Sequence, residues 1–278
     1  MNGSWQLKDG RQLLTQCPFG LMGIVNLTSD SFFDGGRYLS EGGCVSLVGE
    51  MLSTGANIID LGAESTRPGA RPLSPLCEQK KLLPMLNILS RHYPDAVISV
   101  DTYHASTAAL ALEAGAQIIN DISACQYDLS LMDVLAQYKP GYVLMHSRGR
   151  SAVMQDNPRY ENVIDEIMLF FETNLSRLVR NGLPESCIVL DPGIGFGKNL
   201  AHNLSIFRHM EKFKKFGRPL LIGLSMKSFL GQLLDIPLEK RGPATMLATV
   251  LMWKKGVFWH RVHDIAGAVT ALTLASNL

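Results

Sequence analysis

Short hydrophobic runs recur along this chain, and each run ends at a polar residue. Each run has roughly the length of a buried β-strand, and the stretches between runs are long enough for a helix with its loops. The polar residues at the ends of the eight runs are Asn26, Asp60, Asp101, Asn120, His146, Asp191, Ser225 and His263. Eight strands that alternate with helices predict an α/β fold, a (β/α)8 TIM barrel in a single domain.

This alternation also predicts where the active site lies. In a (β/α)8 barrel the carboxyl ends of all eight strands meet at one face, and that face carries the active site. The chain therefore places a carboxylate, amide, hydroxyl or imidazole group at each predicted strand end. A pattern selected for stability alone would not need these groups.

The remaining segments fit the same architecture. Residues 1–20 are expected to form a short lead-in, a hairpin that caps the bottom of the barrel, and residues 21–278 the barrel itself. At 278 residues the chain has about the length of one such domain. The predicted helices cover about residues 41–54, 76–92, 104–114, 129–138, 160–182, 200–215, 239–254 and 265–276.

Composition narrows the class of protein. With 26 basic and 25 acidic side chains the net charge is +1, so we expect no general attraction to nucleic acid or to a membrane surface. The five cysteines are scattered without a CxxC pair, which favours a reduced, cytoplasmic protein over a disulfide framework or zinc site. No signal peptide or membrane-spanning run is predicted.

Two connections are unusually long and polar. TSDSFFDGGRYLSEGG follows the first predicted strand, and AESTRPGARPLSP follows the second. Long loops at the catalytic face of a barrel are usually lids or binding loops, although plain surface loops are the alternative.

The last predicted strand carries a candidate anion site. Arg261 and His263 are two residues apart and share one face of the strand, whereas His260 points the other way. The apparent HxxH pattern is therefore poor geometry for a metal. A guanidinium beside an imidazole favours phosphate binding, and a structural histidine is the alternative.

The segment DPGIGFGK, residues 191–198, resembles a phosphate loop without matching one. A Walker A motif needs Gly where Pro192 stands and Ser or Thr where Asn199 stands. The glycines would let the backbone pass close under a flat ligand, with Phe196 as a wall. A tight structural turn is the alternative, and Asp191 at the strand end favours the ligand.

Three polar strand ends suit a flat, nitrogen-rich ligand. Asp101, Asn120 and Asp191 would be costly to bury without partners. A carboxylate accepts two parallel N–H groups, and an amide donates and accepts at once, as the edge of a 2-amino-pyrimidinone requires. A metal cage is the competing interpretation.

A further cation lies near the seventh predicted strand. Lys227 is expected to project into the barrel mouth, and Ser228 stands at the start of a short helix whose N–H groups attract anions. A capped helix with a solvated lysine is the alternative.

Together these segments resemble the dihydropteroate synthases of folate biosynthesis. The resemblance runs from about residue 20 to the C-terminus, and its motifs appear in the family's order, each at the expected strand end. They are MGIVNLTSDSFFDGG, DLGAESTRPGA, SVDT, IIND, LDPGIGFGK, the Ser-Met-Lys-Ser segment and RVHD.

The resemblance implies an activity. The family are transferases that join the methylene of 6-hydroxymethyl-7,8-dihydropterin diphosphate to the amine of p-aminobenzoate, and diphosphate leaves. It implies Mg²⁺ as the cofactor, bound between Asn26 and the diphosphate. It also implies inhibition by sulfonamides, which mimic p-aminobenzoate, and a homodimer, for which helices at 243–252 and the C-terminus are candidates.

The resemblance also implies roles for individual residues. Asp34 would face the reacting methylene, and the catalytic set would be Asp34, Asp101, Lys227, Arg261 and His263. The pterin site would comprise Asp101, Asn120, Met145, Asp191, Gly223 and Lys227. Diphosphate would be bound by Asn26, Thr66, Arg261 and His263, and p-aminobenzoate by Thr66, Arg67, Pro68, Phe196, Lys227 and Ser228.

Three positions depart from the family pattern. Ser29 stands where Pro is usual, Ala63 where Gly is usual, and Met226 where Arg is usual. The loss of a positive charge at position 226 predicts a weaker or altered p-aminobenzoate site. A non-catalytic pterin-binding paralogue is one alternative. The other is a pterin-dependent methyltransferase, which should lack the two long loops.

Overall fold

The computed structural model describes residues 3–27, 41–64, 72–149, 154 and 157–278. Eight parallel strands lie side by side in the order β8-β7-β6-β5-β4-β3-β10-β9. Leu190 donates its N–H to Pro219 O over 3.0 Å, and a bridge joins Leu190 to Leu220, so the eighth and first members of this order meet. The predicted (β/α)8 barrel is confirmed.

The strands correspond to the hydrophobic runs of the sequence. They are β3 Gly20–Asn26, β4 Ile58–Gly62, β5 Val97–Asp101, β6 Ile118–Asp121, β7 Gly141–Met145, β8 Ile188–Asp191, β9 Leu221–Gly223 and β10 Trp259–Val262. One difference matters for the site. The run that we expected to end at Asp60 continues to Gly62, so Asp60 lies inside the barrel, fully buried, and not at its rim.

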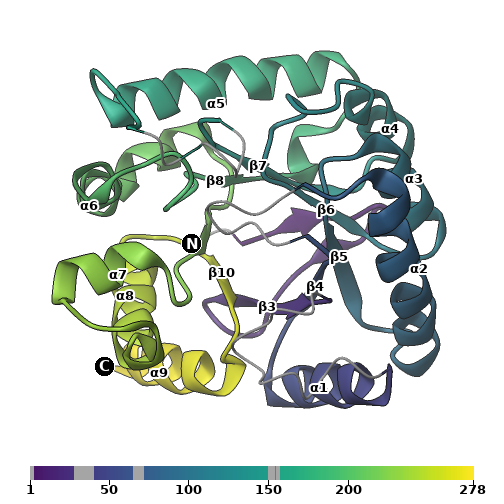
Figure 1. Cartoon of the computed structure of the whole chain (residues 1–278), viewed down its shortest axis with the longest axis horizontal. Coiled ribbons are helices and arrows are strands. Elements are labelled where there is room, and N and C mark those ends of the chain that lie inside the picture. The colour runs from purple at the N-terminus through teal and green to yellow at the C-terminus, as the bar shows by residue number, and fades with distance from the viewer. Residues whose placement is uncertain (1–2, 28–40, 65–71, 150–153, 155–156) are drawn as a thin grey trace.

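Helices surround the strands (Figure 1). They are α1 Glu41–Thr54, α2 Pro75–His92, α3 Ala105–Glu113, α4 Leu131–Tyr138, α5 Val163–Arg180, α6 Leu200–Arg208, α7 Ser228–Leu234, α8 Gly242–Lys254 and α9 Ile265–Asn277. The helix expected at 200–215 is divided, because α6 ends at Arg208 and a 3₁₀ segment, Met210–Phe216, continues the chain. No helix of the described ranges is long and apolar enough to cross a membrane.

Two hydrophobic layers hold the barrel together. The outward faces of the strands pack against the helices, where Ile59, Ile119 and Leu190 are fully buried. The inward faces fill the lower interior, where Met22 and Ile58 belong to a second buried cluster. Because side chains alternate along a strand, the residues two and four positions after Met22 and Ile58 also face inward, and they lie in the middle and at the mouth of the barrel.

A short hairpin lies at the amino ends of the strands. It pairs β1 Trp5–Gln6 with β2 Gln12–Leu13 in antiparallel register. Trp5 is fully buried, donates from Nε1 to Cys187 O over 2.7 Å, and packs edge-to-face on Trp259 with ring centroids 5.7 Å apart. The indole therefore plugs the end of the barrel opposite the strand carboxyl ends.

Candidate functional site

A hydrogen-bonded network joins four strands at the floor of the barrel mouth. Asp60 on β4 accepts from Arg261 Nε on β10 over 2.7 Å and from Asn120 Nδ2 on β6 over 3.0 Å. Arg261 Nη2 also donates to Asp101 Oδ2 on β5 over 3.0 Å. One guanidinium thus lies between two carboxylates, and an amide beside it is fixed by the same aspartate.

Burial governs the charges of this network. It raises the pKa of Asp101 to about 8, although the Arg261 guanidinium pulls in the opposite direction. Burial also works against the charge of Arg261, but Asp60 and Asp101 together raise the pKa of the guanidinium. The floor therefore holds a permanent cation beside a carboxyl group that gains or loses its proton near neutral pH.

A tight turn after β8 forms one wall. Asp191 accepts from the N–H of Gly193 over 2.7 Å, and Gly193 has φ +66°. A Cβ on Gly193 would lie 1.9 Å from His146 O, so a side chain cannot fit there. Burial raises the pKa of Asp191, opposed first by the charge of Lys227. The glycine lets the chain turn directly over the end of β7.

Lys198 holds this turn from inside. Its buried Nζ donates to Gly193 O, Phe196 O and His146 Nδ1, each over 2.9 Å. Burial lowers its pKa well below the usual range for lysine. With its protons directed at protein acceptors, Lys198 supports the backbone around Phe196 and is not directed at a ligand.

Lys227 approaches the same wall from β9 and α7. Its Nζ lies 4.7 Å from the ring centroid of Phe196 and donates to the carbonyl of Ile194. Burial lowers the pKa of Lys227 to about 8, while Asp191 opposes this effect. An ammonium over an aromatic face is a favourable pair, and it brings two predicted ligand residues together.

The residue before Lys227 is held by α8. Met226 has φ +60°, a conformation that costs energy for a side chain of its type. Its carbonyl accepts from Arg241 Nη1 over 3.1 Å, and its N–H donates to Thr245 Oγ1 over 3.2 Å. These two contacts fix the backbone turn that directs Lys227.

Histidine and amide groups stand at the rim. His263 Nδ1 lies 2.9 Å from Ser225 Oγ, which orients the imidazole beside the Arg261 strand. His260 is buried in register with Leu21 and Ile222 on the outer face of β10, as the sequence predicts. Asn26 ends β3 and is half-buried.

Other predicted residues lie around this network or outside the described ranges. Met145 pairs in register with Asp191, and Gly223 pairs with Arg261. Ser228 is exposed at the start of α7. Four predicted site residues fall outside the described residues, namely Asp34, Thr66, Arg67 and Pro68.

Sequence reasoning missed Asp60 and Lys198 as members of the site. The sequence did carry a signal for Asp60, which is one of the eight polar residues at the ends of the hydrophobic runs. Lys198 carried a weaker signal, as the last residue of the glycine-rich segment.

Asn26 is the candidate ligand for a hard cation. It pairs in register with Gly62, which pairs in turn with Asp101, and a Cβ on Gly62 would lie 3.5 Å from Asn26 Oδ1 and 3.6 Å from Asp101 Cβ, so the amide oxygen and the carboxyl group flank the same glycine. The described part of the chain contains no group of three or more His, Cys, Asp or Glu side chains that could hold a metal. An amide oxygen alone suits magnesium, which commonly keeps water and substrate phosphate among its ligands.

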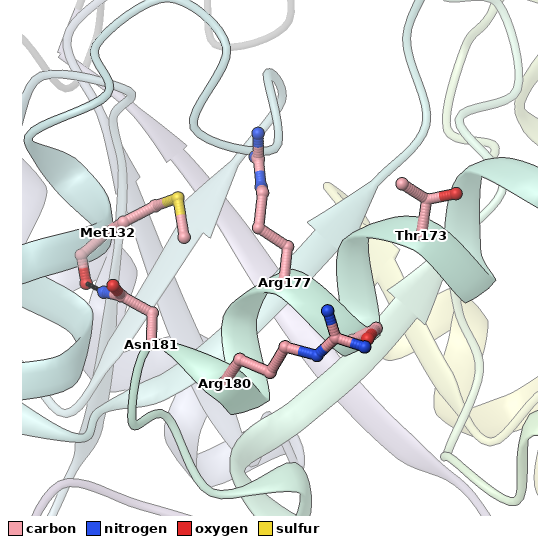
Figure 2. A pocket seen from close by; sticks show the side chains of 6 residues that line it. Met132, Thr173, Arg177, Arg180 and Asn181 are labelled. Carbon is pink, nitrogen blue, oxygen red and sulfur yellow. Dashed lines mark hydrogen bonds between the residues drawn. The ribbon is translucent and has the colours of Figure 1, made fainter.

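A shallow groove also lies on the outside of the barrel, between α4 and α5 (Figure 2). Asn181 Nδ2 closes one end by donating to Met132 O over 2.9 Å. Arg177 and Arg180 point away from each other, and Arg177 Nη2 donates to Ala124 O over 2.6 Å. The two guanidinium groups do not converge, so the barrel mouth remains the candidate site.

Comparison with known proteins identifies the family to which the chain belongs. Residues 22–263 match the family described as "Pterin binding enzyme". A dihydropteroate synthase of Clostridium beijerinckii is 38% identical over 246 residues, which are 88% of each chain. The chain belongs to the dihydropteroate synthase family. A pterin-binding barrel is what the resemblance implied, and this prediction is confirmed.

Solved structures of the family have the same fold. The Yersinia pestis dihydropteroate synthase with a sulfonamide drug complex superposes with a TM-score of 0.91 at 36% identity, over 96% of both chains. The Xanthomonas albilineans dihydropteroate synthase with 4-aminobenzoic acid has a TM-score of 0.89 at 32% identity, over 100% of this chain and 98% of that one.

Proposed function

We propose that this chain is a transferase that condenses 6-hydroxymethyl-7,8-dihydropterin diphosphate with p-aminobenzoate to give 7,8-dihydropteroate and diphosphate. The observation that carries the proposal is the floor network of Arg261, Asp60, Asp101 and Asn120 in a chain of this family. It combines a fixed cation for an anionic leaving group with carboxylate and amide groups for a flat heterocycle.

The pterin is proposed to bind in the barrel mouth. Asp101 and Asp191 would accept N–H groups from its edge, and Asn120 would donate and accept beside them. Lys227 would contact the opposite edge. Met145, 4% exposed, would supply an apolar surface, and Gly223 would let the ring approach the backbone of β9.

Diphosphate is proposed to bind at the rim. Arg261 on β10 and His263, directly after this strand, would bind the diphosphate, and Thr66 would complete this set. Asn26 Oδ1 would hold Mg²⁺ together with diphosphate and water oxygens, beside Gly62. When bound, the ion would neutralise charge on the diphosphate oxygens.

The p-aminobenzoate site is proposed to lie nearer the surface. Phe196 and the aliphatic part of Lys227 would pack on the aromatic ring. The Lys227 ammonium and Ser228 would meet the carboxylate. Thr66, Arg67 and Pro68 would complete the site from the second long loop, and a sulfonamide would occupy the same place.

The chemistry follows from these positions. The C–O bond to diphosphate breaks, the amine nitrogen bonds to the methylene carbon, and the amine gives up one proton to solvent. Arg261 and His263 stabilise charge that develops on the leaving group. Asp101 and Asp191, when ionised, would favour the positive charge left on the methylene, which Asp34 would face. An arylamine is a weak nucleophile, so a cation-like transition state without a covalent enzyme intermediate is expected.

The proposed assembly is a homodimer that uses α8 and α9, which lie side by side (Figure 1). Leu247 on α8 is 63% exposed and Leu274 on α9 is 62% exposed. A second copy that packs on these two helices would remove both leucines from water.

Diphosphate release with and without p-aminobenzoate tests the proposed activity. Release that needs p-aminobenzoate and Mg²⁺ and yields dihydropteroate supports the synthase. Pterin binding without release would indicate the non-catalytic paralogue. Methyl transfer from methyltetrahydrofolate, with no diphosphate chemistry, would indicate the methyltransferase.

A further inference from the structure

Asp60 is a fully buried carboxylate beneath the proposed pterin site. Its Oδ2 accepts from both Arg261 Nε and Asn120 Nδ2, while its Oδ1 has no hydrogen-bond partner within the described residues. Two residues with different proposed tasks therefore share one oxygen atom. Neither task needs Asp60 to touch a substrate.

Strand register separates Asp60 from the ligand. Asp60 pairs with Ile24 and Ser99, whereas the next inward positions along the strands, Gly62 and Asp101, pair with each other. Asn120 pairs with Asp101 in that higher layer. Because Asp60 has no exposed surface, it can act on a bound substrate only through the groups that it holds.

The contact to Arg261 fixes the orientation of the guanidinium. Nε is bound by Asp60 and Nη2 by Asp101, at 2.7 Å and 3.0 Å, so two points on the planar group are held by two different strands. Charge-assisted hydrogen bonds of this kind are strong and directional. With only the Asp101 contact left, the guanidinium could rotate about one anchored nitrogen.

We propose that Asp60 is a positioning residue that holds Arg261 and Asn120 in one fixed relation, so that diphosphate and pterin are bound together in reactive alignment. This inference rests on the proposed function. Alignment of a leaving group contributes chiefly to the rate and to the binding of the diphosphate part of the substrate. The p-aminobenzoate site, near the surface, should be unaffected.

The test compares two pterin ligands and one pair of kinetic constants. Asp60→Asn keeps an oxygen for Asn120 but presents an uncharged amide to Arg261. We expect the affinity ratio of 6-hydroxymethylpterin diphosphate to 6-hydroxymethylpterin, measured by calorimetry, to fall about tenfold. In steady state, kcat should fall by about tenfold or more, while the KM for p-aminobenzoate should stay within about twofold.

Asp121→Asn is the matched control. Asp121 is equally buried and ends β6, but its carboxylate faces outward and accepts from the N–H groups of Ser123 and Cys125 and from Tyr142 Oη. Its loss should lower thermal stability and leave the affinity ratio unchanged. Asp60→Glu is the second variant if Asp60→Asn does not fold. It keeps the charge but moves the carboxylate by one methylene, and the ratio should fall as well.

A double variant tests whether Asp60 acts through Arg261. In an Arg261→Gln background, Asp60→Asn should not change the affinity ratio further, because residues that act through one another are not additive. It should also raise Tm above that of Arg261→Gln alone, because it removes a buried carboxylate that has lost its cationic partner.

Two results would overturn the inference. One is an unchanged ratio in a folded Asp60 variant, and the other is an equal fall in Asp121→Asn. If the wild-type protein binds neither pterin, the proposed function fails instead, so the two failures are distinguishable.

Discussion

At the scale of single residues, burial moves two site groups toward neutral pH from opposite directions. The pKa of Asp101 is raised to about 8 by burial, and that of Lys227 is lowered to about 8 by the same cause. As the pH rises through about 8, the Lys227 ammonium loses its positive charge and the Asp101 carboxyl group gains a negative one. Ligands that depend on one group can therefore be separated from ligands that depend on the other by their pH dependence.

Lys227 gives the first prediction. Its ammonium is charged below a pH of about 8 and neutral above it. The carboxylate of p-aminobenzoate stays ionised throughout, so its KM should rise about fivefold to tenfold between pH 7 and pH 9. Lys227→Arg stays charged over this range and should show a nearly flat profile. An equally steep rise in the arginine variant would assign the effect to another group.

Single residues also show where prediction from the sequence ends. Asp101, Asn120 and Asp191 could be predicted at the barrel mouth because each stands at the end of a hydrophobic run, and Arg261 because it is two residues before His263. The bond between Asp60 and Arg261 could not, because it joins positions 201 residues apart. Only the register of the closed barrel determines which inward side chains meet.

At the scale of elements, the turn after β8 depends on residues without side chains. Gly193, Gly195 and Gly197 have φ values of +66°, +83° and +62°, which glycine adopts readily. The turn passes so close to β7 that Lys198 reaches the carbonyl of His146 over 3.2 Å. The close packing of this turn on the end of β7 places Phe196 beside Lys227.

Gly193→Ala tests the turn. The added Cβ would lie 1.9 Å from His146 O, so the backbone has to move. We expect about 3 kcal/mol or more of lost unfolding free energy and a large fall in kcat/KM for both substrates, measured by urea denaturation and steady-state kinetics.

The control is Gly10→Ala in the hairpin turn. Gly10 has φ +79° but no atom lies within 4 Å of its added Cβ, so only the backbone strain of about 1 kcal/mol is expected, with activity unchanged. Equal losses in the two variants would show that close approach to β7 is not what matters.

Element boundaries were predictable to different degrees. Strands followed from short hydrophobic runs, and α1 matches its predicted residues, 41–54. The helix expected at 160–182 begins at Val163 because the side chain of Asn162 caps the N–H groups of Ile164 and Asp165. Local hydrogen bonds of this kind decide helix ends, and hydrophobic periodicity does not report them.

At the scale of the whole molecule, stability and chemistry lie at opposite ends of the barrel. Trp5, Trp259 and Phe258 pack together at the bottom, where Trp259 and Phe258 rings are 5.3 Å apart. The charged network occupies the mouth. Substitutions at the bottom should therefore change stability without changing the site.

Trp5→Ala tests this separation. The indole is fully buried, so its removal should cost about 3–5 kcal/mol of unfolding free energy, while both KM values at 25 °C stay unchanged in the folded fraction. Leu14→Ala, at a side chain that is 70% exposed, should change stability by less than about 0.5 kcal/mol. A changed KM for the pterin substrate in Trp5→Ala would contradict the separation.

The most direct test of the account is a single-turnover experiment. The protein in excess, with Mg²⁺, is mixed with 6-hydroxymethyl-7,8-dihydropterin diphosphate and p-aminobenzoate, and dihydropteroate and diphosphate are quantified in the same sample. We predict equal amounts of the two products, and neither product without p-aminobenzoate. Bound pterin diphosphate that stays intact, or diphosphate released with hydroxymethyl-dihydropterin in place of dihydropteroate, would contradict the proposed synthase.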